Sequence, residues 1–315
     1  MKNFLILFLA SFCIYSSIAA DRVVIVGGGP VGLATAIEAI TSGHEVTLIE
    51  KRDSYTRKQT IILDEDSLKL LQHWNVSLAT CRIIPIAEDK QIGMVVIQDL
   101  EMALKERASL LGLSYILGQY TMLRDNTIVV ESNQITKEIA YDILVGADGV
   151  KSKVREDAEI SLKHFASAVG RIAFLQPVAF QPDDFTTAFT PIKVGEHFIM
   201  KIPIPAKNGV VICMQSKREC QIHLEELLEH TPVYSDWFEM PLQQATSFIS
   251  ENKHIIIVGD AAACASYLRG GGLNTGFQTA RFAGLFFKDK AYQKYNDCVQ
   301  RTTDTLIEES RFLYN

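Results

Sequence analysis

The clearest pattern along the chain is a short apolar strand, a glycine turn, a helix and a second strand. Arg22 to Val26 is a β-branched run, and residues 27–32 are rich in glycine. Leu33 to Thr41 has the apolar spacing of a helix, and Glu45 to Ile49 has the composition of a buried strand. Because the hydrophobic period differs between strands and helices, this order predicts a βαβ unit.

The rest of the pattern predicts further helices and strands of an α/β domain in the first half of the chain and at its end. The predicted helices are Ser67–Trp74, Leu100–Leu111 and Asn274–Phe287, and the predicted strands are Thr127–Glu131, Ile139–Val145 and His254–Val258. Helices that alternate with buried strands are typical of a parallel sheet.

Residues 164–251 have a different texture, with short apolar or alternating runs interrupted by prolines such as Pro177, Pro182, Pro191, Pro203 and Pro205. The runs are Ile172–Leu175, His197–Ile202 and Gly209–Met214. Such runs favour an antiparallel sheet. We therefore predict a Rossmann-like nucleotide-binding domain formed by residues 21–163 plus 252–315, with an inserted, mostly antiparallel β-sheet substrate domain at 164–251.

The first twenty residues differ from the rest of the chain. Lys2 precedes an apolar run from Phe4 to Tyr15, and small residues follow as far as Ala20. This pattern predicts a signal peptide at residues 1–20 and export to a secreted, periplasmic or lumenal location, with an uncleaved N-terminal anchor as the alternative. Beyond this segment we expect no integral membrane span.

Charge and residue spacing exclude some partners. The net charge is -6 over 315 residues and no basic stripe occurs, so nucleic acid is not an expected partner. The seven histidines lack metal-site spacing, and we predict no metal. The cysteines show no CxxC pair and are expected to be buried hydrophobic residues.

The glycine turn has the chemistry of a dinucleotide site. Gly27, Gly29 and Gly32 satisfy GxGxxG between a strand and a helix, and Glu50 stands eighteen residues after Gly32 at the end of the next strand. Glycines allow a tight turn and a close approach of pyrophosphate to the helix N-terminus, while Glu50 can accept hydrogen bonds from ribose hydroxyls. A glycine turn without a ligand is the alternative.

Two later segments distinguish FAD from NAD as the expected nucleotide. Tyr141 to Arg155 contains Gly-Ala-Asp-Gly, and Ile255 to Ala262 ends in Gly-Asp-Ala-Ala before the loop Gly270–Asn274. With the N-terminal unit they resemble the three fingerprints of the class A FAD-dependent monooxygenases, which have the p-hydroxybenzoate hydroxylase fold. The resemblance implies FAD as cofactor, with Asp260 on the ribityl chain, Asp148 and Gly149 near the pyrophosphate, and Asn274 opening a helix beside the flavin ring.

The first half of the chain resembles a narrower group. Glu50 to Arg57 and the segment Ile97–Leu100 look like the MICAL-type flavin monooxygenases, in which the counterpart of Arg57 helps to seat the flavin. Gln98 stands where an arginine is common. Surface charge is the alternative for Arg52 and Arg57. The complete set of expected cofactor-binding residues is Gly27, Gly29, Pro30, Val31, Gly32, Glu50, Lys51, Arg52, Arg57, Gln98, Asp148, Gly149, Gly259, Asp260, Gly271, Gly272, Leu273 and Asn274.

The chain departs from the class A pattern after Ala262. Residues 263–269 replace the usual histidine and prolines, and Cys264 invites a redox hypothesis, although a buried thiol is the better interpretation. We assign no catalytic residue. The resemblance implies a monooxygenase that takes hydride from NAD(P)H as a transient co-substrate and transfers oxygen from O2 through a flavin hydroperoxide to an unknown small molecule or protein. An FAD oxidase or dehydrogenase, and a non-catalytic flavin-binding protein that engages a partner, are the alternatives.

Overall fold

The apolar run that begins at residue 22 forms the central strand of a parallel sheet. In a computed structural model, β1 (Arg22–Val26) lies between β10 (Ile143–Gly146) and β2 (Glu45–Glu50). The sheet continues to β17 (Ile255–Ile257) on one side and β6 (Ser114–Leu117) on the other, and every pairing is parallel. The structure describes residues 20–57, 59–79, 82–87, 90–175, 191–204, 209–219, 233–252 and 254–315. The predicted signal peptide therefore falls outside the described residues, apart from Ala20.

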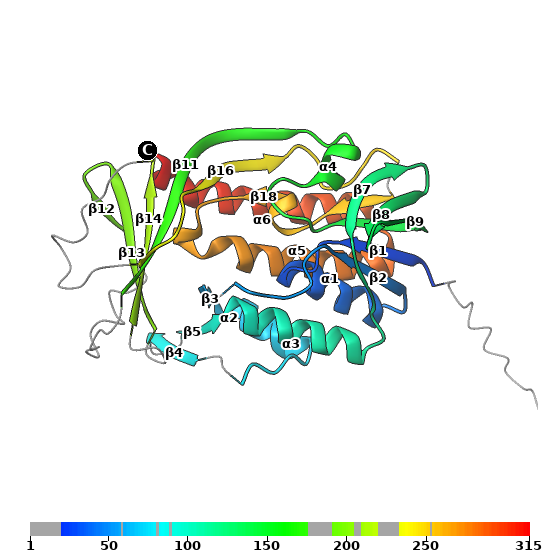
Figure 1. Cartoon of the computed structure of the whole chain (residues 1–315), viewed down its shortest axis with the longest axis horizontal. Coiled ribbons are helices and arrows are strands. Elements are labelled where there is room, and N and C mark those ends of the chain that lie inside the picture. Colours follow the sequence, from blue (N-terminus) through cyan, green and yellow to red (C-terminus); the bar gives the residue numbers. More distant parts are fainter. Residues whose placement is uncertain are drawn as a thin grey trace, which may run out of the picture.

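Helices pack on this sheet and on one another (Figure 1). Leu33 and Ile37 of the first helix, Leu104 of the third and Phe277 of the fifth are fully buried in one core. The helices are α1 (Pro30–Thr41), α2 (Glu65–His73), α3 (Ile97–Leu110), α4 (Lys153–Asp157), α5 (Gly271–Asp289) and α6 (Tyr292–Ser310), with 3-10 turns at Gly259–Ala261, Tyr267–Arg269 and Arg311–Tyr314. Among the described residues, no helix combines the length and apolar composition needed to cross a membrane.

Three of the predicted helices begin three residues earlier than expected. The observed starts are Pro30, Ile97 and Gly271, where the apolar pattern first appears at Leu33, Leu100 and Asn274. The N–H groups of a first helical turn are not bonded within the helix and face a cap or a ligand. The side chains of that turn therefore need not follow the helical spacing of apolar residues. The prediction that Asn274 opens its helix is therefore wrong by one turn, and Gly271 opens it.

The segment of short apolar runs forms an antiparallel sheet of seven strands, in the order β12-β13-β14-β11-β16-β18 with β15 beside β11. The strands are β11 (Leu162–Leu175), β12 (Ile192–Val194), β13 (His197–Ile204), β14 (Gly209–Ser216), β15 (Val233–Tyr234), β16 (Phe238–Ala245) and β18 (Ala263–Cys264). The last of these strands follows the Gly-Asp-Ala-Ala segment, so residues of the nucleotide half join this sheet. The predicted α/β fold class is confirmed, whereas the predicted division into domains stays a prediction.

Two small antiparallel sheets complete the fold, and one of them corrects the sequence prediction. The first contains β3 (Thr60–Leu63), β5 (Lys90–Val96) and β4 (Arg82–Ala87), in that order. The second contains β7 (Gln119–Arg124), β8 (Thr127–Ser132) and β9 (Ile135–Ala140). The predicted strand Ile139–Val145 is in fact the end of β9 and the start of β10, in two different sheets. The chain turns between them at Asp142, whose carboxylate accepts hydrogen bonds from the backbone N–H and the guanidinium of Arg22 at 2.8 to 3.0 Å.

This turn predicts a measurable pH dependence of stability. Hydrogen bonds from Arg22 hold the pKa of Asp142 at about 2, below its ordinary value. A lowered pKa contributes stability that is present above the ordinary value and is lost as pH falls through the folded-state value. Because both side chains are exposed, we expect Asp142→Asn to lower the melting temperature at neutral pH by less than about 3 °C. Thermal unfolding should show this difference shrinking between about pH 5 and about pH 2.5. A difference that is constant with pH would contradict the assignment.

Candidate functional site

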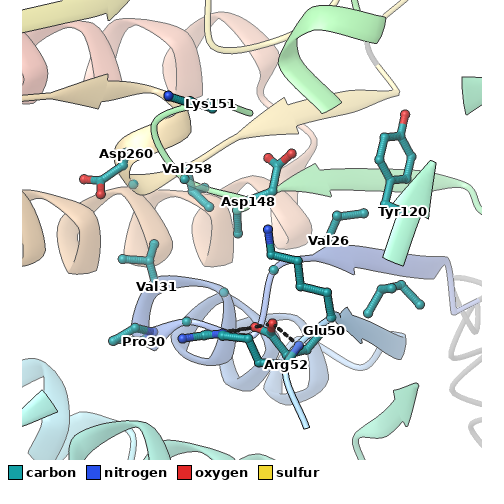
Figure 2. Close-up of a pocket in the computed structure, with 18 of the residues that line it drawn as sticks. Val26, Pro30, Val31, Glu50, Arg52, Tyr120, Asp148, Lys151, Val258 and Asp260 are labelled. Atoms are coloured by element: carbon teal, nitrogen blue, oxygen red, sulfur yellow. Dashed lines mark hydrogen bonds and ion pairs between the residues drawn. The ribbon is translucent and has the colours of Figure 1, made fainter. Parts of the chain in front are cut away.

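A cavity of about 390 Å³ lies at the carboxyl ends of β1, β2, β10 and β17 (Figure 2). Ligands of open parallel sheets bind at this edge. Fifteen of the residues expected from the sequence line the cavity: Gly27, Gly29, Pro30, Val31, Gly32, Glu50, Lys51, Arg52, Arg57, Asp148, Gly149, Gly259, Asp260, Gly272 and Leu273. The fold thus brings three distant motifs into one site.

The glycine turn forms one wall of the cavity, and its glycines serve different purposes. A Cβ on Gly32 would lie 1.9 Å from the carbonyl oxygen of Gly27, and Gly27 itself has a positive φ of 108° with Ala147 close by. These two positions need glycine for the fold. A Cβ on Gly29 would meet nothing nearer than Arg57 Nη2 at 4.0 Å, so this glycine leaves open space in the cavity. That space fits a diphosphate against the backbone.

The start of α1 supplies the charge that such an anion needs. Gly29 precedes the helix in an extended conformation and Pro30 occupies its first turn, where no acidic side chain or side-chain cap is present. The first N–H groups of a helix have no partners within it and carry the positive end of the helix dipole. The turn is therefore suited to bind a phosphate group.

Glu50 lies at the end of β2 and is 4% exposed. It accepts hydrogen bonds from Gly28 N at 2.8 Å and from Arg52, whose backbone N, Nε and Nη2 lie 2.9, 3.0 and 2.9 Å from its oxygens. Burial raises the pKa of Glu50, but the bonds from Arg52 and Gly28 outweigh it, and the net pKa is lowered. Glu50 is therefore an ionised acceptor at the position expected for a ribose.

Arg57 lies close to the glycine turn, with Nη2 4.0 Å from the position of a Cβ on Gly29, and it pairs with the buried Glu101 of α3. Asp260 also lines the cavity, and its side chain is exposed there. Burial raises the pKa of Asp260, and the charge of Arg57 acts in the opposite direction. Cationic and acidic groups therefore both line the cavity, which suits a ligand that carries both phosphates and hydroxyls.

Asp148 and Asp260 lie on turns that are fixed by neighbouring side chains. The Asp148 carboxylate accepts from Ser152 Oγ and from the backbone N–H groups of Lys153 at 2.7 Å and Val154 at 3.1 Å, so it caps α4. The buried Arg155 on that helix donates to the carbonyl oxygen of Ala261 at 3.0 Å. The second and third motifs are thus joined directly.

Three expected site residues do not line this cavity. Gly271 and Asn274 line a second cavity of about 640 Å³ between α5, α6 and the strands β3 and β5. The Asn274 side chain bonds to Ser67 Oγ at 2.7 Å, Asp64 N at 3.2 Å and Gly270 O at 2.9 Å, so it ties α5 to α2. Gln98 is half-buried, and its backbone N–H donates to Arg57 O at 3.1 Å. Their expected roles in cofactor binding stay predictions.

The segment that departs from the class A pattern is bonded to the antiparallel sheet. Tyr267 OH donates to the carbonyl oxygen of Met214 at 2.8 Å, and Ser266 Oγ bonds to the Gln215 side chain. Burial, with the nearby charge of Asp260, raises the pKa of the Cys264 thiol. A thiol with a raised pKa is a poor nucleophile, which argues against the redox hypothesis. The expectation of buried cysteines holds for Cys213, whereas Cys264 and Cys298 are half-buried.

Sequence reasoning missed several residues of the site. Tyr120 on β7 and Lys151 on the turn before α4 line the cavity, and both are labelled in Figure 2. Tyr120 OH donates to Asp157 at 2.6 Å. The buried Glu101 carboxylate pairs with Arg52 and Arg57. No motif marks these positions, although Glu101 is an acidic residue on the apolar face of a predicted helix, which is a signal for a buried charge.

Comparisons with known proteins agree with this geometry. Residues 98–285, more than half of the chain, match the family described as FAD binding domain, and residues 22–60 match the family described as FAD dependent oxidoreductase. The human [F-actin]-monooxygenase MICAL2 is 27% identical over 141 residues, which cover 41% of this chain and 7% of that protein. The chain thus spans a small part of these curated relatives, and the likeness to MICAL-type proteins is confirmed for that part.

Solved structures show the same fold at low sequence identity. The anhydrotetracycline hydroxylase OxyS from Streptomyces rimosus superposes with a TM-score of 0.75 at 18% identity, over 93% of this chain and 68% of that one. The p-nitrophenol 4-monooxygenase PnpA from Pseudomonas putida DLL-E4 gives 0.74 at 14% identity, over 92% and 86%. The chain therefore belongs to the FAD binding domain family and has the fold of the flavin monooxygenases.

Proposed function

We propose that the protein is an NAD(P)H-dependent monooxygenase. The observation that carries this proposal is the single nucleotide cavity in which all three motifs meet. The sequence has one GxGxxG, which suits enzymes that admit a nicotinamide cofactor transiently instead of binding it in a second domain. Bound FAD would accept a hydride from NAD(P)H and pass one atom of O2 to a substrate, with the other atom leaving as water.

The residues of the cavity would divide the work of holding FAD. The N-terminus of α1 and Arg57 would bind the diphosphate, because both present positive charge beside the open space at Gly29. Glu50 would accept hydrogen bonds from the adenosine ribose. Asp260 would bond to the hydroxyls of the ribityl chain near Gly272, at the other end of the cavity.

An absorption spectrum tests both the cofactor and the electron donor. We expect the chain from Asp21 onward to be purified with a flavin spectrum that bleaches when NADPH or NADH is added without oxygen. Asp260→Ala is the control, and it should reduce the affinity for FAD by about tenfold or more because a charged acceptor for the ribityl hydroxyls is lost. A flavin that stays oxidised with both donors would overturn the NAD(P)H dependence, and it would favour a binding protein.

Oxygen chemistry separates the monooxygenase from an oxidase. After reduction, admission of labelled O2 with candidate substrates should place one labelled atom in a product and one in water. Peroxide that accounts for all of the donor oxidised, with every substrate tested, would instead support an FAD oxidase on the same scaffold.

A further inference from the structure

Two buried carboxylates share one arginine beneath the nucleotide cavity. Arg52 Nη2 lies 2.9 Å from Glu50 Oε2, and Arg52 Nη1 lies 3.5 Å from Glu101 Oε1. Glu101 is 0% exposed, whereas Arg52 and Arg57 remain about one third or more exposed at the cavity. The guanidinium of Arg52 therefore stands between two anions, one of which belongs to the expected ribose position.

The acceptor positions of Glu50 are fully used. A carboxylate offers about four lone-pair sites, and Glu50 receives four donors: Gly28 N and three N–H groups of Arg52. Two of these donors belong to the Arg52 guanidinium and two to the backbone. A ribose hydroxyl can bond to Glu50 only when the guanidinium leaves, while both backbone bonds stay in place.

Unlike Glu50, Glu101 has a carboxylate oxygen that accepts no hydrogen bond from the described residues. Its Oε1 is bonded to Arg57, but within the described part of the chain its Oε2 has no hydrogen-bond partner. A buried carboxylate oxygen without a donor is unfavourable, because it has lost water and gained nothing in exchange. The unused acceptor belongs to the same carboxylate whose Oε1 lies 3.5 Å from Arg52 Nη1.

We propose that Glu101 is a positioning residue of the nucleotide site, which receives the Arg52 guanidinium when a ribose takes its place on Glu50. The movement exchanges one charged hydrogen-bond partner for another, so Arg52 stays paired and both Glu50 and Glu101 become satisfied. Glu101 keeps Arg57 at the cavity throughout. The inference rests on the proposed function, because it assumes that FAD binds in this cavity.

The test compares ADP, which carries the ribose hydroxyls of FAD, with 2′,3′-dideoxy-ADP, which lacks them. Both displace FAD from the purified protein, and the dissociation constant of each follows from flavin fluorescence. Glu101→Gln should raise the dissociation constant of ADP by about tenfold, because the Arg52 guanidinium displaced from Glu50 then has no second carboxylate to bind. The dissociation constant of dideoxy-ADP should rise clearly less, because that ligand does not displace Arg52 from Glu50 and loses only the support that Glu101 gives to Arg57. A general structural defect would weaken both ligands equally.

Two further variants complete the experiment. Glu106→Gln changes the same charge at an exposed position of the same helix, and it should leave both constants unchanged. Arg52→Met frees Glu50 in advance, so it should increase the preference for ADP over dideoxy-ADP. Equal losses of the two ligands in Glu101→Gln, or an unchanged preference in Arg52→Met, would overturn the inference while FAD binding stands. Failure of the parent protein to bind FAD would overturn the proposed function and the inference together.

Discussion

Gly29→Ala is expected to abolish tight FAD binding and leave the apoprotein folded. In the structure an added Cβ at this position has open space around it, and the backbone has an ordinary negative φ of -71°. The same Cβ would occupy the space through which a diphosphate reaches the first N–H groups of α1. We expect the dissociation constant of FAD to rise by about 100-fold or more, measured by fluorescence titration of the apoprotein.

The stability of the same variant is the discriminating measurement. Alanine restricts the unfolded chain, which stabilises, but it is a poorer residue than glycine before a helix, which destabilises. These small effects oppose each other, so the melting temperature of the apoprotein should change by less than about 2 °C. Gly32→Ala is the matched control. Its Cβ would lie 1.9 Å from a carbonyl oxygen, and it should cost about 3 kcal/mol of folding free energy. Normal FAD affinity in Gly29→Ala would exclude the glycine turn as the diphosphate site.

The contrast between these glycines shows which parts of the site follow from sequence. The turn and Glu50 lie within one βαβ unit, where local backbone geometry fixes the spacing between glycines and acidic residue. Glu101 and Arg155 are different, because their partners Arg57 and Ala261 lie 44 and 106 residues away. The pairing of such residues is decided by how helices pack on the sheet, which no local period records.

In the fold, too, some elements follow from local sequence and others depend on tertiary contacts. Strong apolar runs such as Arg22–Val26 become buried strands, because burial on both faces of a parallel sheet requires continuous apolar composition. The run Ile139–Val145 is apolar except for Asp142, and it is divided between two sheets at that residue, whose carboxylate accepts hydrogen bonds from Arg22. Helix α6 was not predicted, since its buried residues are a narrow stripe among polar ones. Tertiary contacts decide both cases.

A buried ion pair joins the two helices whose first turns line the nucleotide cavity. Glu38 of α1 is 1% exposed, and both of its carboxylate oxygens accept from Arg281 Nη1 on α5, at 3.1 and 3.0 Å. Trp74 Nε1, after α2, donates to the same carboxylate at 2.8 Å. A Cβ on Gly284 would lie 2.1 Å from Glu38 Oε2, so this glycine gives the carboxylate room. One side chain thus holds three helices in register.

Glu38→Ala should therefore be strongly destabilising. The change leaves the indole N–H without its acceptor and Arg281 without its partner, and breaking one side of a buried pair costs about 3 to 5 kcal/mol. Because the Arg281 side chain is 30% exposed and can reach water, we expect the lower end of that range. A loss of about 3 kcal/mol corresponds to a fall of about 6 °C or more in melting temperature, measured by thermal unfolding of the apoprotein.

The surrounding groups supply the controls for this prediction. Glu38→Gln keeps an acceptor for Trp74 but loses the charge, so its effect should lie between those of wild type and Glu38→Ala. Glu106→Ala removes the same charge from an exposed helical position, and it should cost less than about 0.5 kcal/mol. In a double-mutant cycle, Arg281→Ala should cost much less when Glu38 is already alanine, because the pair is then absent. Equal costs in both backgrounds would show that the ion pair does not hold α1 and α5 together, and that packing of apolar residues such as Phe277 carries this contact.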